Sequence, residues 1–286
     1  MLRTSSQERT LKTILLLLLM QAMTGNRPFT RSVFQGETII LQLTEQQCSG
    51  TIAVFSRAYV CRPDNSIVVG VDFLAQPNTY TVTDDDAPIG TLLVMARSYR
   101  TRHLSSRACK LSPEKCISLK ERRAQERRRI LTALASGPVI YTDQFPAGIE
   151  FQHPLEPIKL TGLFGDRRFF GKSPSWHRGV DVSAAIGTPI VTASYGAVVL
   201  SEEFLLEGAT VIIYHGSDIS TVYLHLSKSH VQRGQTVNSG DIIGLSGSSG
   251  SSGQPHLHFG VYINGAIVDP IAFIEQFNRF LYTEDP

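Results

Sequence analysis

The chain has 286 residues, of which 42% are hydrophobic and 18% are charged, and its formal net charge is +2. A chain of this length can fill two modest hydrophobic cores. The nearly balanced charge excludes a global electrostatic attraction to nucleic acid or to anionic membranes, so no nucleic-acid partner is expected.

The N-terminus has the pattern of an export signal. Arg3, Arg9 and Lys12 precede an apolar run at residues 14–20, and small residues follow it. A basic start, a short apolar segment and small residues are typical of a secretory signal peptide. The run is short for a membrane-spanning helix. We predict that residues 1–24 are a signal peptide, with an uncleaved anchor that tethers the protein to the membrane as the alternative.

Short alternating runs of apolar and polar residues follow the predicted signal. They lie at 38–43, 51–59 and 67–73, and turns rich in Gly, Pro, Asn and Asp, such as 63–66, separate them. Alternation with a period of two, interrupted by turn residues, predicts strands. We therefore predict a small β-sandwich over residues 29–100.

Four cysteines, Cys48, Cys61, Cys109 and Cys116, agree with export, because an even count in an exported chain suggests two disulfides. Three pairings exist in principle. Nearest-neighbour pairing is the simplest, since each bond then closes a short local loop. A four-cysteine zinc site is the alternative, but the absence of any Cys-x-x-Cys spacing disfavours it.

A helix is predicted from Ser112 to Leu134. The first residue is a good N-cap, Pro113 suits the first helical position, and Gly137-Pro138 form a stop signal. Residues 114–129 include seven basic and three acidic side chains. Binding to an anionic polymer is one interpretation, but no aromatic residues interleave with the arginines. We therefore favour a solvated helix that bridges two domains, within a helical linker at 101–137.

The segment from His256 to Ile263 alternates almost without fault. Its apolar set is Leu257, Phe259, Val261 and Ile263, and the opposite set is His256, His258, Gly260 and Tyr262. Two imidazoles two residues apart therefore stand on one face of a strand, about 6–7 Å apart. One can bind a metal ion while the other acts on what the metal activates, with a pair of solvated histidines as the alternative.

An upstream motif, His177-Arg178-Gly179-Val180-Asp181, supplies further ligand types. Residues four apart in an extended strand lie about 13 Å apart, and Gly179 beside β-branched neighbours is a poor helical stretch. We therefore predict a bend at Gly179 that brings His177 and Asp181 to one point. Two imidazoles and one carboxylate leave a fourth position for water, as in catalytic zinc sites.

A third alternating segment lies between these two, at residues 221–226. Its pattern predicts a strand. Tyr223 and His225 are expected on the polar face, and Val222, Leu224 and Leu226 are expected in the core.

The motifs occur in a fixed order: His-x-x-x-Asp at 177–181, Tyr-x-His-Leu at 223–226, His-x-His at 256–258, an Asn-Gly turn at 264–265 and Asp-Pro at 269–270. This order resembles that of the lysostaphin/LytM family of zinc metallopeptidases. The similar region runs from Gly162 to Pro270. A short terminal helix is expected after it, at 271–281.

The resemblance implies a role for each matching residue. His177, Asp181 and His258 match the zinc ligands of the family, so one Zn²⁺ per chain is expected. His225 and His256 match its two other active-site histidines, which assist the attacking water and the developing oxyanion. Which of these two is the general base stays open.

Other groups near these motifs receive lesser roles. Tyr223 is expected at the rim of the site against substrate, with donation to the oxyanion as the alternative. The loop 247–255 is rich in Gly and Ser and is expected to rim the groove; Gln254 is an extra residue relative to the commonest family pattern. No metal role is predicted for His103, His153, His215 and His230.

The resemblance also implies an architecture. The expected fold is mainly β, with an antiparallel-sheet peptidase domain of LytM type at 138–286 after the linking helix. The β domain at 29–100 is similar to the immunoglobulin-like modules of some family members.

The function implied is that of a zinc-dependent endopeptidase that hydrolyses peptide crosslinks of bacterial peptidoglycan, with the peptide stems as its partner. D,D-endopeptidase activity in a periplasm is favoured, and secretion is the alternative location. The alternative function is a catalytically silent module that binds peptidoglycan or activates an amidase; the full set of ligands disfavours it. Domain order suggests a further hypothesis, that the N-terminal domain covers the groove and keeps the enzyme latent.

Overall fold

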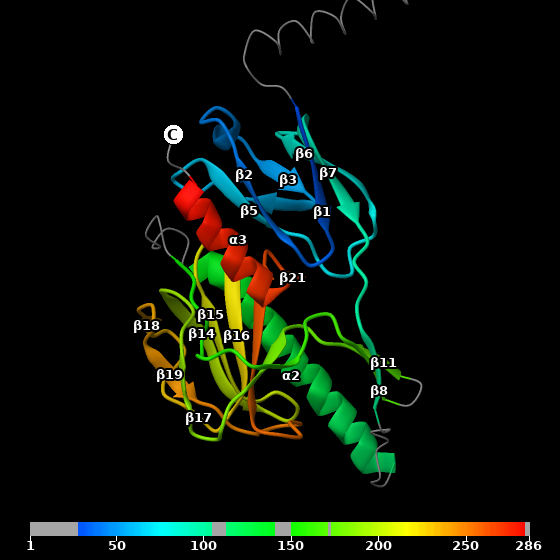
Figure 1. Ribbon diagram of the computed structural model, residues 1–286, viewed down its shortest axis with the longest axis vertical. Coiled ribbons are helices and arrows are strands. Elements are labelled where there is room, and N and C mark those ends of the chain that lie inside the picture. The colour runs from blue at the N-terminus through cyan, green and yellow to red at the C-terminus, as the bar shows by residue number, and fades with distance from the viewer. Residues whose placement is uncertain (1–27, 105–112, 141–149, 171–172, 284–286) are drawn as a thin grey trace, which may run out of the picture.

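The computed structural model describes residues 28–104, 113–140, 150–170 and 173–283. Figure 1 shows an N-terminal β region above a larger β region, with helix α2 beside the larger one. The predicted signal peptide and Cys109, with the second predicted disulfide, lie outside the described residues. No helix in the described ranges has the length and hydropathy that a bilayer crossing requires.

The N-terminal region packs two sheets around one core. A five-stranded sheet has the order β1-β7-β6-β3-β4, with β1 parallel to β7, and a separate ribbon pairs β2 with β5. The elements are β1 Phe29–Phe34, β2 Thr38–Gln42, a 3-10 turn Gln47–Ser49, β3 Ile52–Val54, β4 Arg57–Tyr59, β5 Ser66–Gly70, β6 Asn78–Asp84 and β7 Ala87–Met95. The predicted β structure of this region is confirmed.

The β2–β5 ribbon joins two cores. Ile39 and Leu41 face the five-stranded sheet, whereas Ile40 and Val68 belong to the core of the C-terminal region. Successive side chains of a strand point to opposite faces, so one ribbon serves both cores. Helix α3 (Pro270–Thr283) packs on the second face. The two regions therefore share continuous apolar packing.

One predicted disulfide lies in the N-terminal region. Cys48 and Cys61 are bonded and close a loop with a sequence separation of 13. Closing a loop of this length contributes about 3 kcal/mol in the chain-entropy model. We expect the Cys48→Ser/Cys61→Ser variant to lose about that much stability and roughly 6–12 °C in Tm. Thermal unfolding by circular dichroism checks this, and an unchanged Tm would contradict it.

The C-terminal region is built on one large sheet whose neighbouring strands are all antiparallel. The strand order is β18-β14-β15-β16-β20-β12-β9, and β21 also pairs with β20, along Val261–Ile263. The strands are β9 Leu160–Gly162, β12 Val180–Ser183, β14 Gly196–Phe204, β15 Gly208–Tyr214, β16 Ile219–Leu226, β18 Thr236–Val237, β20 His256–Ile263 and β21 Ala266–Val268. A smaller sheet, β13 Pro189–Val191, β19 Ile242–Leu245 and β17 Lys228–Ser229, adds to the same core. The predicted antiparallel sheet is confirmed.

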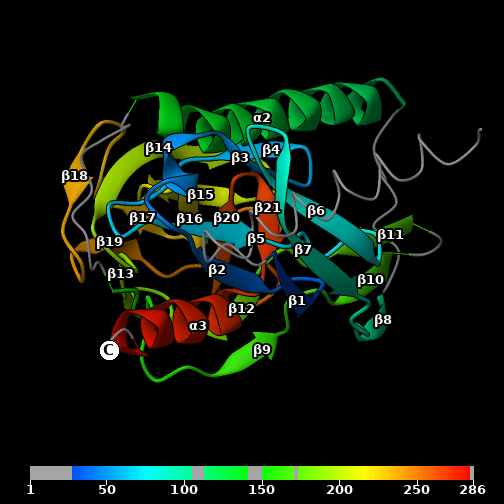
Figure 2. The ribbon, with the colours of Figure 1, turned by 90° about the horizontal axis from the view of Figure 1, so that it is seen from above.

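Helix α2 (Pro113–Ile140) covers the face of the large sheet opposite α3, as Figure 2 shows. Ala133 is buried there against residues of β14–β16, and Ile130 and Leu134 pack beside it. Glu126 is buried and accepts hydrogen bonds from the Leu205 amide and from Arg122. The basic side of α2 is exposed, as the interpretation of a solvated helix predicts, but the helix is more than a bridge, because its apolar side docks on the sheet.

The ends of α2 test the predicted cap and stop signals. The helix begins at Pro113 as predicted, but it continues past Gly137-Pro138 to Ile140. A proline removes one helical hydrogen bond. Near the end of a helix that is held by tertiary packing, such a local signal can be overridden.

The predicted helical linker also begins with a strand. Residues Thr101–Leu104 form β8, which pairs in parallel with β10 (Arg167–Phe170), and β11 (Ser173–Trp176) lies antiparallel on the other side of β10. Arg100 binds Asp166 through two hydrogen bonds of 2.9 and 2.6 Å. This small sheet therefore ties the chain that leaves the N-terminal region to the loop preceding β12.

Candidate active site

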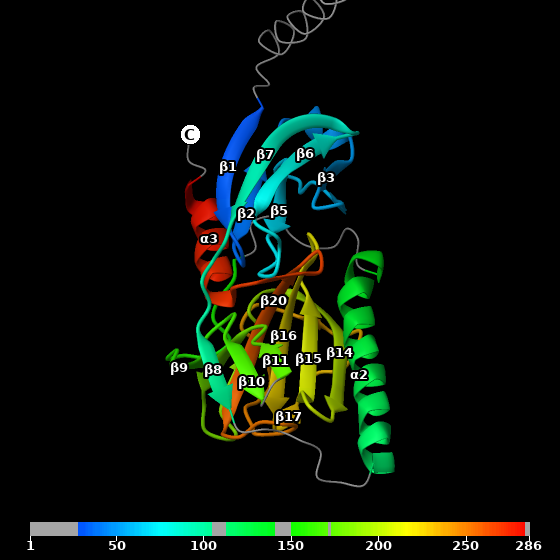
Figure 3. The same cartoon turned by 90° about the vertical axis from the view of Figure 1, so that its right-hand side faces the viewer.

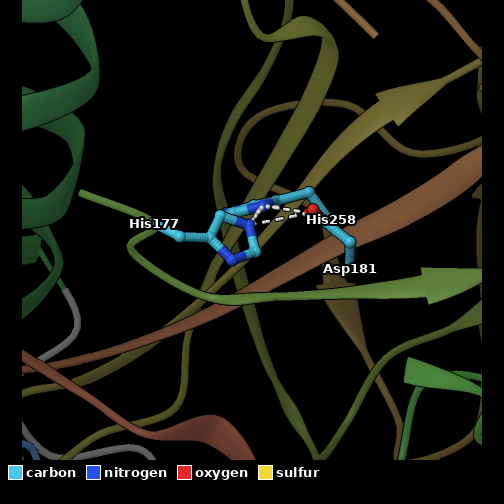
Figure 4. A group of neighbouring side chains, drawn as sticks. All are labelled: His177, Asp181 and His258. Atoms are coloured by element: carbon cyan, nitrogen blue, oxygen red, sulfur yellow. Dashed lines mark hydrogen bonds and ion pairs between the residues drawn. The ribbon is translucent and has the colours of Figure 1, made fainter. Parts of the chain in front are cut away.

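Three metal-ligating side chains meet on the face of the large sheet (Figure 4). The Nε2 atom of His177 lies 2.8 Å from Oδ1 of Asp181 and 3.0 Å from Nδ1 of His258, and His258 Nδ1 lies 2.9 Å from the same Oδ1. One ligand atom from each residue lies within 4.8 Å of the others. The structure thus brings together the three residues that the sequence predicted as ligands.

Strand register explains why two of them meet. Asp181 of β12 and His258 of β20 are directly paired across the antiparallel ladder, and side chains of such a pair lie on the same face. His177 precedes β12, and the backbone bends at Gly179, as predicted. A Cβ atom on Gly179 would overlap the carbonyl oxygen of Phe259 and lie 2.8 Å from His258 Nε2. Only glycine allows β12 to approach β20 this closely.

Hydrogen bonds orient the ligand atoms. His177 Nδ1 lies 2.7 Å from the carbonyl oxygen of Leu163 and can donate its proton there, which leaves Nε2 with a free lone pair toward the cluster. Arg168 of β10 donates to Oδ2 of Asp181 at 2.8 Å, so Oδ1 faces the two imidazoles. Sequence reasoning missed Arg168, because this residue is positioned by the β8–β10–β11 sheet and no sequence motif predicts that sheet.

Electrostatics keep the cluster ready for a cation. Burial alone would raise the pKa of Asp181, but the surrounding imidazoles of His177, His256 and His258 outweigh burial and hold that pKa well below its usual range. Burial also lowers the pKa of His258 to about 4. A carboxylate and neutral imidazoles are the protonation states that bind metal.

The two other predicted histidines flank the cluster. The ring centroids of His225 and His256 are 4.9 Å apart, and those of His225 and His258 are 6.2 Å apart. His225 Nδ1 is 3.0 Å from the Ser249 carbonyl oxygen, and His256 Nδ1 is 2.7 Å from that of Gln254. If each Nδ1 donates to its carbonyl, each Nε2 carries a lone pair that can accept a proton, and a proton taken up by His256 Nε2 would face Oδ1 of Asp181 at 3.5 Å.

Their environments differ. Burial, followed by the neighbouring His258 and His256, lowers the pKa of His225 to about 4. Burial lowers the pKa of His256 as well, but its interaction with Asp181, 3.5 Å from Nε2, and with the Gln254 carbonyl outweighs burial and raises that pKa.

Tyr223 is not at the rim of the site, so that expectation was wrong. Its ring is fully buried in the main core, whereas Leu224 lines the groove. Strand β16 carries a bulge here, because the partners of Ala209 and Val211 in β15 are Leu226 and Tyr223. His225, with φ of 63°, is the extra residue. The bulge therefore turns His225 to the groove although Tyr223 points into the core.

The hydroxyl of Tyr223 has a structural role, since it accepts hydrogen bonds from the Ala193 amide at 2.8 Å and from Thr221 Oγ1 at 3.0 Å. We expect Tyr223→Phe to lose about 1–3 kcal/mol of stability, because a buried amide loses its acceptor. For the peptide hydrolysis that the sequence analysis predicts, the kcat of this variant should stay close to that of the unchanged protein at temperatures well below Tm. Denaturant unfolding and a rate assay check this; a large fall in kcat without a loss of stability would restore a catalytic role.

The remaining histidines stand apart from the cluster. His215 is buried, and its ring contacts the Tyr195 carbonyl oxygen at 2.7 Å and Thr221 Oγ1 at 2.6 Å. His103 stacks on Phe169 with ring centres 5.1 Å apart. Among the described residues, the group of possible metal ligands consists of His177, Asp181 and His258 and includes neither of these histidines.

A groove of roughly 880 Å³ opens over the cluster. One wall is the loop 251–255, as predicted for the Gly/Ser-rich segment, and another includes Arg127, Ile130 and Leu131 of α2. None of the described residues 28–95 lines this groove. The hypothesis that the N-terminal β region covers the site therefore finds no support among the described residues.

Comparisons with known proteins agree with this geometry. Residues 175–270 match the sequence profile of Peptidase family M23. This part of the chain belongs to peptidase family M23. The match, called the M23 segment below, includes all five predicted site residues: His177, Asp181, His225, His256 and His258.

Named relatives cover the same part of the chain. The peptidoglycan DD-endopeptidase ShyA of Vibrio cholerae is 43% identical over 113 residues, which is 39% of this chain and 26% of that protein. The DD-carboxypeptidase/endopeptidase Mpg of Neisseria meningitidis is 36% identical over 121 residues, or 42% and 28% of the two chains. The matched segment thus spans little more than a quarter of either relative.

A solved structure extends the likeness beyond the M23 segment. A crystal structure from Pseudomonas aeruginosa, assigned to peptidase M23, superposes with a TM-score of 0.63 and covers 85% of this chain and 96% of the other, at 23% identity. The two chains therefore share the fold of the N-terminal sheets, the helix and the peptidase sheet.

Proposed function

We propose that the protein is a zinc-dependent endopeptidase that hydrolyses peptide crosslinks of bacterial peptidoglycan, with a D,D-peptide bond as the favoured target. The observation that carries this proposal is the convergence of His177, Asp181 and His258 beneath an open groove. The printed activities of the M23 relatives ShyA and Mpg support the choice of substrate.

The donor set suits zinc. Two imidazole nitrogens and one carboxylate oxygen are a ligand set of catalytic zinc sites, in which a fourth position stays open. The carbonyl of Leu163 behind His177 and the guanidinium of Arg168 behind Asp181 act as outer partners that fix the ligands. Bound there, Zn²⁺ supplies a Lewis acid and lowers the pKa of a coordinated water.

The two flanking histidines supply proton transfer in this proposal. The Nε2 atoms of His225 and His256 are free of the carbonyls that hold each Nδ1, so each can take a proton from the attacking water or give one to the leaving amine. An imidazolium beside the scissile carbonyl also stabilises the developing oxyanion. Both residues are therefore proposed as catalytic.

Localisation and domain organisation follow as parts of the same proposal. The Cys48–Cys61 disulfide and the substrate class favour an exported protein, with the periplasm as the preferred compartment. We further propose that residues 29–100 form an immunoglobulin-like β domain, that residues 101–137 form a helical linker and that residues 138–286 form the peptidase domain.

The test is a digest of purified crosslinked peptidoglycan by the zinc-loaded full chain, with products identified by mass spectrometry. We expect crosslinked muropeptide dimers to be converted to monomers. The new termini of these products would identify the bond that is cleaved. A matched sample treated with a chelator should leave the dimers intact, and added Zn²⁺ should restore cleavage. A protein that binds one zinc ion per chain and binds peptidoglycan, but leaves every dimer intact, would contradict the proposal and favour a silent binding module.

A further inference from the structure

Cations from outside the M23 segment line the active-site groove. They are Arg102 of β8, Arg127 of α2 and Arg168 of β10, and the M23 segment adds Arg178. The acidic residues among the groove walls are Asp181, which belongs to the metal cluster, and Glu207. Figure 3 shows β8 and β10 on one side of the strands that carry the histidines, and α2 on the other. The groove is therefore basic along two flanks.

Two of these cations are already engaged. Arg168 donates to Asp181 at 2.8 Å, and Arg178 hydrogen-bonds the hydroxyl of Tyr262. The guanidinium groups of Arg168 and Arg178 therefore already bind side chains of the protein.

The other two cations are less fully engaged, although the charge of Arg127 acts on the groove residue Glu207 and opposes the rise in the pKa of its carboxyl that burial causes. The carboxylate oxygen that Arg102 approaches, Oδ2 of Asp166, is 3.9 Å away and already accepts a 2.6 Å hydrogen bond from Arg100. Within the described part of the chain, no carboxylate lies within 4.0 Å of Arg127. Both side chains are exposed toward the groove that they line.

We propose that Arg102 and Arg127 bind free carboxylates of the peptide substrate, so that the enzyme prefers acidic crosslinked stems to uncharged bridges. The inference rests on the proposed function, since it concerns the substrate of the same groove. Guanidinium groups bind carboxylates through strong, charge-assisted and often bidentate hydrogen bonds. Basic groove walls also concentrate anionic substrate. Peptide stems carry side carboxylates, whereas a bridge made of glycine carries none.

Solvated surface arginines are the alternative, and α2 offers a matched control. Arg128 is the next residue on the same helix, is also exposed, and does not line the groove. If Arg127 acts only through the general positive charge of α2, Arg128→Gln should have the same effect as Arg127→Gln. A specific contact predicts an effect at Arg127 alone.

The experiment compares two substrates of the zinc-loaded full chain: a crosslinked muropeptide dimer with free stem carboxylates, and the same dimer with those carboxylates amidated. We expect kcat/KM to be about tenfold higher for the free form, which corresponds to about 1.4 kcal/mol. The Arg127→Gln and Arg102→Gln variants should each lower this ratio, and the double variant should bring it close to one. Arg128→Gln should keep the ratio.

Equal rates on the two dimers in the unchanged protein would overturn the inference, as would equal losses in Arg127→Gln and Arg128→Gln. If neither dimer is hydrolysed, the proposed function fails, and the inference is then decided by the Kd of each dimer for the same proteins. A preference for the free form that Arg127→Gln removes supports it, and equal Kd values overturn it.

Discussion

The His258→Ala variant is expected to lose both zinc binding and hydrolysis. His258 Nδ1 lies within 3.0 Å of His177 Nε2 and of Asp181 Oδ1, so its removal leaves two ligands. A catalytic zinc ion contributes several kcal/mol of transition-state stabilisation, so activity should fall by about 10³-fold or more. Zinc content by atomic absorption and release of muropeptide monomers are the two measurements. Normal zinc content in this variant would remove His258 from the ligand set.

The flanking histidines provide a control that separates ligands from acid–base groups. His225→Ala and His256→Ala should each keep one zinc ion per chain, because the carbonyls of Ser249 and Gln254 hold these rings outside the ligand triad. Loss of a positioned general acid or base lowers the rate by about 10²–10⁴-fold. If either variant lost zinc together with activity, the histidine that it replaces would be reassigned as a zinc ligand.

The Gly179→Ala variant is expected to damage the metal site without removing any ligand. The added Cβ would overlap the Phe259 carbonyl and crowd Nε2 of His258, so β12 and β20 must separate. Overpacking of this kind typically costs about 1–3 kcal/mol of stability. The displaced ligands should weaken zinc binding by about 10–100-fold, as when outer partners of a metal site are lost.

Zinc titration with a competing chelator and thermal unfolding measure both effects. Gly253→Ala is the matched control, because a Cβ at Gly253 meets nothing within 4 Å and this glycine also belongs to the groove wall. Identical zinc affinity in the two variants would show that the close approach at Gly179 does not position the ligands.

The sequence predicted the ligand cluster because the relevant signals are local. Alternation from His256 to Ile263 is reproduced in β20, whose apolar set is buried and whose histidines face the groove. The bend at Gly179 followed from the poor fit of this segment to either helix or extended strand. Short motifs, each within one strand or turn, therefore sufficed to name residues that meet in space.

What the sequence did not predict depends on contacts between distant segments. The bulge in β16 inverts the faces of Val222 and Tyr223, and nothing in the alternation of 221–226 marks the extra residue. The pairing of β8 with β10 joins residues more than sixty positions apart. The docking of α2 depends on Ala133 and its neighbours meeting the sheet, whereas the arginines dominated the pattern. Non-local pairing of this kind leaves little trace in periodicity.

The β2–β5 ribbon means that the N-terminal region is not a detachable module. Ile40 and Val68 complete the apolar interior beneath α3, so excising residues 28–100 would leave that interior open to water on one side. Phe73, which packs edge-on against Phe164 and Trp176 near the His177 loop, would go with it. The chain should behave as one cooperative unit, in which integrity of the catalytic centre depends on a segment that contributes no side chain to the groove.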